Sequence, residues 1–278
     1  WKGLYFMKFS FLTYLFCRYP LEYSFQMAQN YGFDAIEIWG ARPQAYAYDL
    51  NTQEIQNILS YKKKYHLDIS AYTPEILSYP YNLASTNKKE REETEDYLLR
   101  SLDAAAAMVT TNMLLTIPHP GYRTSKRQAL DIILEPLKRL CNRAEELGIS
   151  IMLETLSPSE SNLVTTADEA AELISRVGSS AMTAMMDLVP PTIANEPISC
   201  YFDWLGDKMN YVHICNSDGE TEFHSRLDEG IIPMEDIFTL LKKYGFKGWC
   251  SLELLNPYFR DPELYLANSK RLMDRYFA

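Results

Sequence analysis

Four side chains able to bind a metal or move a proton stand at the ends of short apolar runs. They are Glu154 in "SIMLE", Asp187 in "AMMD", His213 in "YVHI" and Glu253 in "SLEL". A buried carboxylate is costly unless it is paired or bound to a cation, and three that converged would also repel one another. We therefore expect one divalent metal ion per chain. Three oxygen donors and one nitrogen donor suit Mn²⁺ best, with Mg²⁺, Co²⁺ or Zn²⁺ as the alternatives.

Each of these residues also has a simpler interpretation. Asp187 taken alone would fit the N-cap of a following helix. His213 taken alone would fit a histidine buried in the core. The spacing along the chain is not that of a short metal motif, so the metal prediction depends on a fold that brings the four strand ends together.

Short apolar runs alternate with helical patterns along the whole chain. The expected strands cover residues 9–13, 35–39, 68–72, 113–117, 150–154, 184–187, 211–215 and 249–254. The clearest helical patterns have apolar residues three and four positions apart and cover 52–65, 88–108, 125–147, 167–176, 233–244 and 262–276. We expect Thr52 and Ser125 to cap the helices that they begin.

Repeated units of helix, glycine and strand, such as "YGFDAIEI" and "LGISIMLE", require parallel strands. Eight expected strands favour an α/β fold of the (β/α)₈ TIM-barrel type over an open doubly wound sheet. In such a barrel the active site lies at the carboxyl ends of the strands. We expect a single domain over residues 7–278, with residues 1–6 as an upstream or added extension before Met7, and a loop at 73–86 over the barrel mouth.

Composition excludes several classes of partner. The formal net charge of −10 repels phosphate backbones, so we expect no nucleic-acid partner and no anionic membrane surface. No apolar run is long enough to span a membrane, and the first residues lack a signal-peptide pattern. The five cysteines form no CxxC pair, which indicates reduced thiols and a cytoplasmic location.

Long stretches of the sequence resemble a known family. They are "IEIWGARPQAYAYDL" at 36–50, "YTPE" at 72–75, "YPYN" at 79–82, "LETLSPSESNLV" at 153–164, "MMDLVPP" at 185–191 and "EPISCYFDWLGDKMNYVHICNSDG" at 196–219. From Met7 onward the chain is similar to the xylose isomerase-like sugar isomerases and epimerases, and within them to the fructoselysine 3-epimerases. The resemblance implies a metal-dependent epimerase of a small sugar, and a homo-oligomer.

The resemblance also implies roles for individual residues. Glu154, Asp187, His213 and Glu253 would bind the metal, and Glu154 and Glu253 would also move the proton. Glu160 matches a position that hydrogen-bonds the hydroxyl groups of the substrate; its simpler interpretation is a solvated loop acid.

Further candidates for substrate contacts are less specific. His119 matches a position that lines the site, and His224 and Arg226 lie in the loop after the seventh expected strand. Each would equally fit an ordinary surface residue. Aromatic side chains near the mouth would form apolar walls or simply pack there; they are Tyr14, Trp39, Tyr72 and Tyr81.

The chain departs from the family pattern at three places. Pro190 stands where many family epimerases have a histidine, as fits the fructoselysine branch. Gly219 stands where several relatives have an arginine. After His224 the usual Pro-Gly pair is Leu227-Asp228. These departures lie among the expected contacts to the far end of the substrate.

The expected chemistry is proton transfer beside a carbonyl group. A metal stabilises the ene-diolate of a ketose, one carboxylate removes the C3 proton, and a second carboxylate returns a proton to the opposite face. Return of the proton at C1 would instead give an aldose.

Other functions remain open. The alternatives are another ketose or ketose-phosphate isomerase or epimerase of the superfamily, an inosose-type dehydratase, and a sugar-binding barrel without catalysis. No clear phosphate site is visible in the sequence. A repair endonuclease of this fold is rejected, because it needs more metal-binding histidines than the four present.

Overall fold

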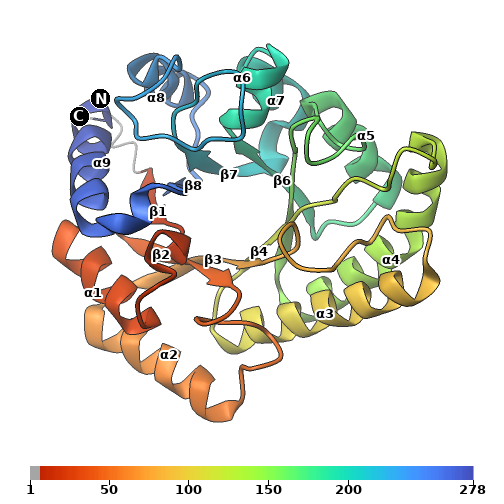
Figure 1. The fold of residues 1–278 in the computed structure, drawn as a ribbon, viewed down its shortest axis with the longest axis horizontal. Helices are drawn as coiled ribbons and strands as arrows, with labels where there is room; N and C mark the ends of the chain where they lie inside the picture. Colours follow the sequence, from red (N-terminus) through yellow and green to blue (C-terminus); the bar gives the residue numbers. More distant parts are fainter. Residues whose placement is uncertain (1–6, 278) are drawn as a thin grey trace.

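Parallel strands curve into a barrel at the centre of the computed structural model, which describes residues 7–277 (Figure 1). The strands are β1 (Lys8–Phe11), β2 (Ala35–Gly40), β3 (Asp68–Pro74), β4 (Asn112–Leu115), β5 (Ser150–Glu154), β6 (Met182–Asp187), β7 (Met209–Ile214) and β8 (Trp249–Leu252). Their order is β1-β8-β7-β6-β5-β4-β3-β2, and a parallel bridge between Leu12 and Glu37 links the two ends of the sheet. The predicted eight-stranded TIM barrel is confirmed. The extension predicted at residues 1–6 lies outside the described residues.

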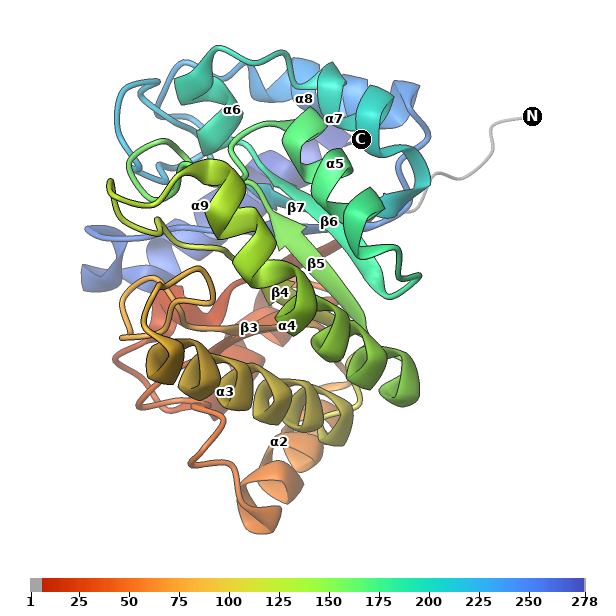
Figure 2. The same ribbon diagram turned by 90° about the vertical axis from the view of Figure 1, so that its right-hand side faces the viewer.

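Helices surround the barrel and cover the outer face of its sheet (Figures 1 and 2). They are α1 (Leu21–Tyr31), α2 (Thr52–Tyr65), α3 (Lys88–Ala107), α4 (Lys126–Leu147), α5 (Ala167–Val177), α6 (Val189–Ala194), α7 (Ser199–Leu205), α8 (Met234–Lys243) and α9 (Pro262–Phe277). Each predicted helical range matches one of these helices to within one residue at either end. The apolar side of α5, which includes Leu173 and Ile174, is buried as the three- and four-residue spacing predicts.

The two predicted caps have different outcomes. Ser125 caps α4 as predicted, because its hydroxyl accepts from the Gln128 amide while the Gln128 side chain accepts from the Ser125 amide. Thr52 does not cap α2. The cap is Asn51, which has an extended backbone and accepts from the amides of Gln53 and Glu54. Thr52 is already the first residue of the helix.

The core has two parts. A large apolar cluster lies between the sheet and the helices, and a small one inside the barrel consists of Ala71, Leu114, Met152, Met185 and Tyr211. The barrel interior also holds polar groups. For example, the Tyr211 hydroxyl lies 2.8 Å from Ser70 Oγ. Tyr211 therefore belongs to the inner apolar cluster and also makes a polar contact inside the barrel.

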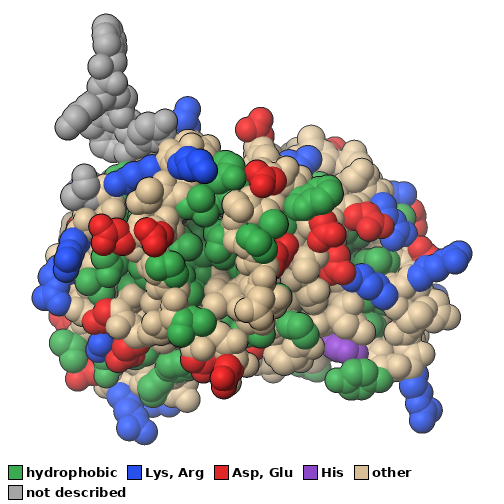
Figure 3. All heavy atoms as spheres, turned by 90° about the horizontal axis from the view of Figure 1, so that it is seen from above, with side chains coloured by type: hydrophobic (Ala, Val, Ile, Leu, Met, Phe, Trp, Pro, Cys, Tyr) green, Lys and Arg blue, Asp and Glu red, His purple; other side chains and the backbone are tan. Residues whose placement is uncertain are grey.

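The surface carries charges of both signs. On the face drawn in Figure 3, acidic and basic side chains are interspersed among apolar ones. Ion pairs join neighbouring helices, such as Arg143 on α4 with Asp103 on α3 at 2.7 Å. Within residues 7–277 no helix has the length and apolar character that a membrane crossing requires.

Candidate metal centre and active site

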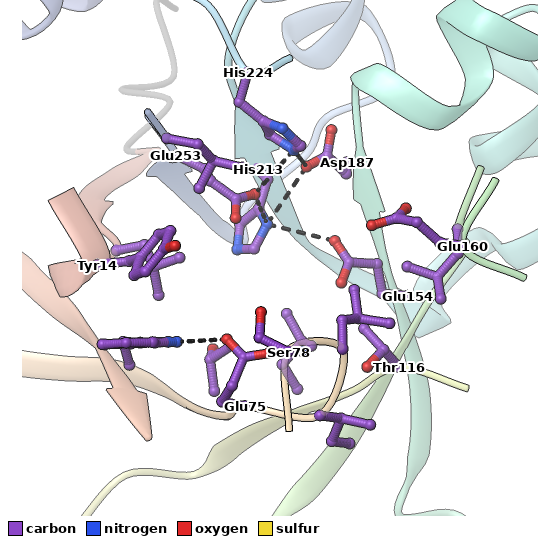
Figure 4. Close-up of a pocket in the computed structure, with 18 of the residues that line it drawn as sticks. Tyr14, Glu75, Ser78, Thr116, Glu154, Glu160, Asp187, His213, His224 and Glu253 are labelled. Atoms are coloured by element: carbon purple, nitrogen blue, oxygen red, sulfur yellow. Dashed lines mark hydrogen bonds and ion pairs between the residues drawn. The ribbon is translucent and has the colours of Figure 1, made fainter. Parts of the chain in front are cut away.

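The four predicted ligand residues meet at the carboxyl ends of four neighbouring strands (Figure 4). Glu154, Asp187 and His213 lie on β5, β6 and β7, and Glu253 directly follows β8. One donor atom from each residue lies within 4.8 Å of the donor atoms of the others. His213 Nδ1 is 3.5 Å from Glu154 Oε1, 3.6 Å from Asp187 Oδ2 and 2.7 Å from Glu253 Oε2. The barrel thus produces the convergence that the strand positions predict.

His213 provides the test of whether a cation fits here. Its Nε2 lies 3.0 and 3.1 Å from the two carboxylate oxygens of Glu37, and an ionised carboxylate can only accept a hydrogen bond. In the neutral ring, Nε2 therefore carries the hydrogen and Nδ1 carries a lone pair. Nδ1 is buried, and although Glu253 Oε2 lies 2.7 Å away, no described residue makes a hydrogen bond of suitable geometry with it. A lone pair that faces three carboxylates fits a divalent cation bound between them.

Burial and charge shift the pKa values of this cluster in opposite directions. Burial, together with Glu253 and Asp187, raises the pKa of Glu154 to about 7 against the effect of His213. Burial also opposes ionisation of Asp187, but His224 and His213 outweigh it and hold the pKa of Asp187 well below its usual range. Burial lowers the pKa of His213, yet Glu37 and Glu253 outweigh it and raise that pKa.

His224 belongs to the layer directly around the four residues. Its Nε2 lies 2.9 Å from Asp187 Oδ2 and 3.4 Å from Glu253 Oε2. Burial lowers the pKa of His224, but Asp187 and Glu253 outweigh it and raise this pKa to about 10. The His224 side chain therefore reaches the pocket while it also fixes the orientation of Asp187.

A cavity of 210 Å³ opens above the cluster, and the loop predicted to cover the mouth forms part of its wall. Trp39 lines this cavity, and its Nε1 donates to Glu75 Oε2 at 2.8 Å. The acidic lining residues are Glu75, Glu154, Glu160, Asp187, Glu222 and Glu253. Of the residues that the structure describes, no lysine or arginine lines the cavity. The lining is thus rich in carboxyl groups, with His213 and His224 as its basic side chains.

The sequence of this chain matches a known protein family. Residues 25–276 match the family described as xylose isomerase-like TIM barrel. The chain is 35% identical over 261 residues to a fructoselysine 3-epimerase of Escherichia coli O157:H7, covering 94% of each protein. The chain belongs to the sugar epimerases of this family.

Solved structures share the fold of this epimerase at low sequence identity. A D-psicose 3-epimerase crystallised in the presence of D-fructose superposes with a TM-score of 0.83 at 16% identity, covering 98% of this chain and 99% of that protein. The IOLI protein, whose crystal structure holds a zinc atom, gives a TM-score of 0.83 at 18% identity and covers 98% of each chain.

Three predicted substrate contacts lie outside the pocket lining of the epimerase. Tyr72 is fully buried, and its hydroxyl donates to the Ala45 carbonyl at 2.7 Å. His119 Nδ1 accepts from the Gly121 amide at 2.9 Å. Arg226 is held by ion pairs to the acidic residues Asp228 at 3.0 Å and Glu229 at 3.2 Å. The structure thus does not bring these side chains to the cavity, because each is engaged elsewhere. Glu160, Trp39 and His224 do line it.

Three acidic residues of the site were not predicted from the sequence: Glu37, Glu75 and Glu222. Glu37 is fully buried in β2, where burial raises its pKa but His213, Thr73 and Ser251 outweigh burial and bring the pKa below its usual value. A glutamate inside the apolar run "AIEIW" was a signal, because such a residue requires a partner. Glu75 and Glu222 lie in loops, and no local pattern marks them.

Proposed function

We propose that this protein is a metal-dependent epimerase that inverts C3 of fructoselysine and gives psicoselysine. The observation that carries the proposal is the convergence of His213 Nδ1 with carboxylate oxygens of Glu154, Asp187 and Glu253, all within 4.8 Å of one another. Two of these carboxylates, Glu154 and Glu253, come from β5 and from the end of β8. The 35% identity to a fructoselysine 3-epimerase supports the choice of substrate.

The four residues at the strand ends would hold the metal, which supplies Lewis-acid stabilisation of the negative charge that develops on the substrate oxygens. Glu154 and Glu253 approach the cavity from different sides of His213 (Figure 4). One removes the C3 proton and the other delivers a proton to the opposite face, which inverts the configuration. His224 holds Asp187 in place during this exchange.

The charge of the pocket favours a substrate that carries an amine. Six carboxyl groups line the cavity, and one divalent cation together with protonated His224 would offset only part of the charge of the ionised ones. Burial, reinforced by Glu222, raises the pKa of Glu160 to about 8. One carboxylate oxygen of Glu222 is buried without a partner among the described residues. The ammonium group of fructoselysine, attached at C1, would relieve this repulsion, whereas a sugar phosphate would increase it.

Three properties beyond the reaction are also proposed. The oxygen-rich donor set supports Mn²⁺ as the resident ion, over Mg²⁺, Co²⁺ and Zn²⁺. The five free cysteines support a cytoplasmic location. The family resemblance supports a homo-oligomer, and sedimentation of the purified protein tests that state.

The substrate proposal is tested by comparing kcat/KM for fructoselysine, fructose and fructose 6-phosphate in the Mn²⁺-loaded enzyme. We expect the values to fall in that order, by about tenfold or more at each step, which corresponds to about 1.4 kcal/mol. A preference for the phosphate would replace the proposal with a ketose-phosphate epimerase, and aldose products would indicate an isomerase. Turnover of none of these sugars would favour the sugar-binding alternative.

A pair of variants tests the role of the acidic pocket lining. Glu222→Gln removes a lining carboxylate, so we expect the preference for fructoselysine over fructose to drop about tenfold. Glu220→Gln removes an exposed carboxylate two residues away and is expected to keep the wild-type preference. Equal preferences in the two variants would show that Glu222 does not recognise the amine.

A further inference from the structure

Glu37 is a buried carboxylate that lies behind the proposed metal ligands and takes no part in the reaction described above. It lies in β2 with a side chain that is fully shielded from solvent. Its Oε2 lies 3.0 Å from Nε2 of the His213 ring. Burying an ionised carboxylate without a lysine or arginine is costly, so its position calls for an explanation.

The Glu37 carboxylate is the acceptor in each of its side-chain hydrogen bonds. The Thr73 hydroxyl donates to Oε1, and the Tyr211 hydroxyl donates to Oε2 at 2.9 Å. His213 Nε2 lies 3.1 Å from Oε1 and 3.0 Å from Oε2. A carboxylate among three donors has no hydrogen to offer, so Nε2 must supply the hydrogen of the contact with His213.

We infer that Glu37 is a positioning residue: its carboxylate keeps the hydrogen of His213 on Nε2 and leaves Nδ1 free to bind the metal. A ring that carried its hydrogen on Nδ1 would point an N–H group at the ion and could not bind it. The inference rests on the metal dependence proposed above. Glu37 would thus support a metal ligand from β2, a strand that contributes no proposed metal ligand of its own.

The support for Glu37 reaches down into the barrel. The Tyr211 hydroxyl lies 2.8 Å from Ser70 Oγ on β3 and 3.4 Å from Ser10 Oγ on β1. Ser70 Oγ in turn donates to the Ile36 carbonyl, beside Glu37, at 3.1 Å. The orientation of His213 is therefore fixed by groups from β1, β2, β3 and β7, which lie on the rigid barrel rather than on loops.

The test compares the Mn²⁺ affinity of two isosteric variants, measured by competition with a fluorescent chelator in the metal-free protein. Glu37→Gln replaces one acceptor with an NH₂ donor in a place where only donors surround it. We expect its dissociation constant for Mn²⁺ to rise about 10- to 100-fold. The control Glu196→Gln changes a carboxylate that accepts from the Ala167 amide at 3.0 Å and does not line the cavity, and we expect a change of less than about threefold.

The outcomes separate this inference from the proposed function. Equal Mn²⁺ affinity in Glu37→Gln and the wild type would overturn the inference alone. A wild-type protein that bound no divalent ion would overturn both. If Glu37→Gln fails to fold, the ¹⁵N NMR spectrum of the histidine-labelled, Zn²⁺-loaded wild type shows instead which ring nitrogen of His213 carries the hydrogen. A hydrogen on Nε2 of His213 is the expected result, and a hydrogen on Nδ1 would overturn the inference.

Discussion

The two ring nitrogens of His213 lie in opposite surroundings, and this asymmetry organises the site at the scale of single residues. Nε2 contacts Glu37 inside the barrel, while Nδ1 faces Glu154, Asp187 and Glu253 at the mouth. The mouth residues were predictable from sequence, because each stands where an apolar strand ends. Glu37 was missed because it lies within a strand, and only the closed barrel brings β2 against β7 across the interior.

If Glu154 and Glu253 act on opposite faces of the substrate, removal of each one should block a different half of the reaction. Glu154→Gln and Glu253→Gln each keep an oxygen that can bind the metal but lose one carboxylate that moves a proton. We expect kcat for epimerisation to fall about 10²- to 10⁴-fold in both. Each variant should still exchange the C3 hydrogen of one epimer with D₂O, and the epimer should differ between the two variants.

Metal content must be matched before these rates are compared, because both residues are also proposed ligands. Exchange of the same epimer in both variants would contradict the assignment of the two carboxylates to opposite faces of the substrate.

The raised pKa of Glu160 predicts how the stability of the metal-free protein depends on pH. Burial, with Glu222 and Glu154, raises this pKa to about 8 from the ordinary 4.5, so the folded state binds more protons than the unfolded state between these values. The stabilisation from Glu160 is therefore complete below pH 4.5 and is lost as the pH rises through about 8. One proton gives a limiting slope of about 1.4 kcal/mol per pH unit.

Urea unfolding at a series of pH values measures this slope. We expect the free energy of unfolding of metal-free Glu160→Gln to decline less steeply from pH 5 to pH 8 than that of the wild type. Glu172→Gln, which changes an exposed carboxylate on α5, is the control and should keep the wild-type slope. An unchanged slope in Glu160→Gln would show that this group is ionised throughout the range.

At the scale of elements, the loop between β7 and α8 shows why part of the site could not be predicted. The Asn216 side chain donates to the carbonyls of Leu227 and Ile232 at 3.0 and 3.1 Å, and its Oδ1 accepts from the Ile232 amide at 2.9 Å. This fold of the loop brings Glu222 and His224 to the cavity. Sequence patterns locate strands and helices by periodicity, but a loop held by one buried amide has no period to detect.

Helix boundaries follow local hydrogen-bonding chemistry and were predictable to within a residue, yet the cap of α2 was assigned to the wrong neighbour. Asn51→Ala removes the side chain that accepts from two free amides, so we expect a loss of about 1 kcal/mol of unfolding free energy. Thr52→Ala places a better helix former at the first helical position and should be neutral or slightly stabilising. Denaturant unfolding of both variants measures the difference, and a larger loss in Thr52→Ala would reinstate Thr52 as the cap.

At the scale of the whole molecule, the barrel separates stability from chemistry. The helices and the outer face of the sheet form the large apolar core, while the functional groups gather at one end of the barrel. The alternation of strands and helices made this architecture predictable from sequence. The charge of the pocket was predictable only in part: four of its six acidic residues were predicted from the sequence, whereas Glu75 and Glu222 come from loops that only the closed fold brings to the cavity.

The central claim is metal-dependent proton exchange at C3 of fructoselysine, and NMR tests it most directly. The enzyme is stripped with a chelator, reloaded with Mn²⁺ and incubated with fructoselysine in D₂O, and the sugar is examined after the protein is removed. We predict loss of the C3 proton signal together with the appearance of psicoselysine, and neither change in the metal-free enzyme. Full retention of the C3 proton by an enzyme shown to hold its metal, or equal exchange without metal, would contradict the account.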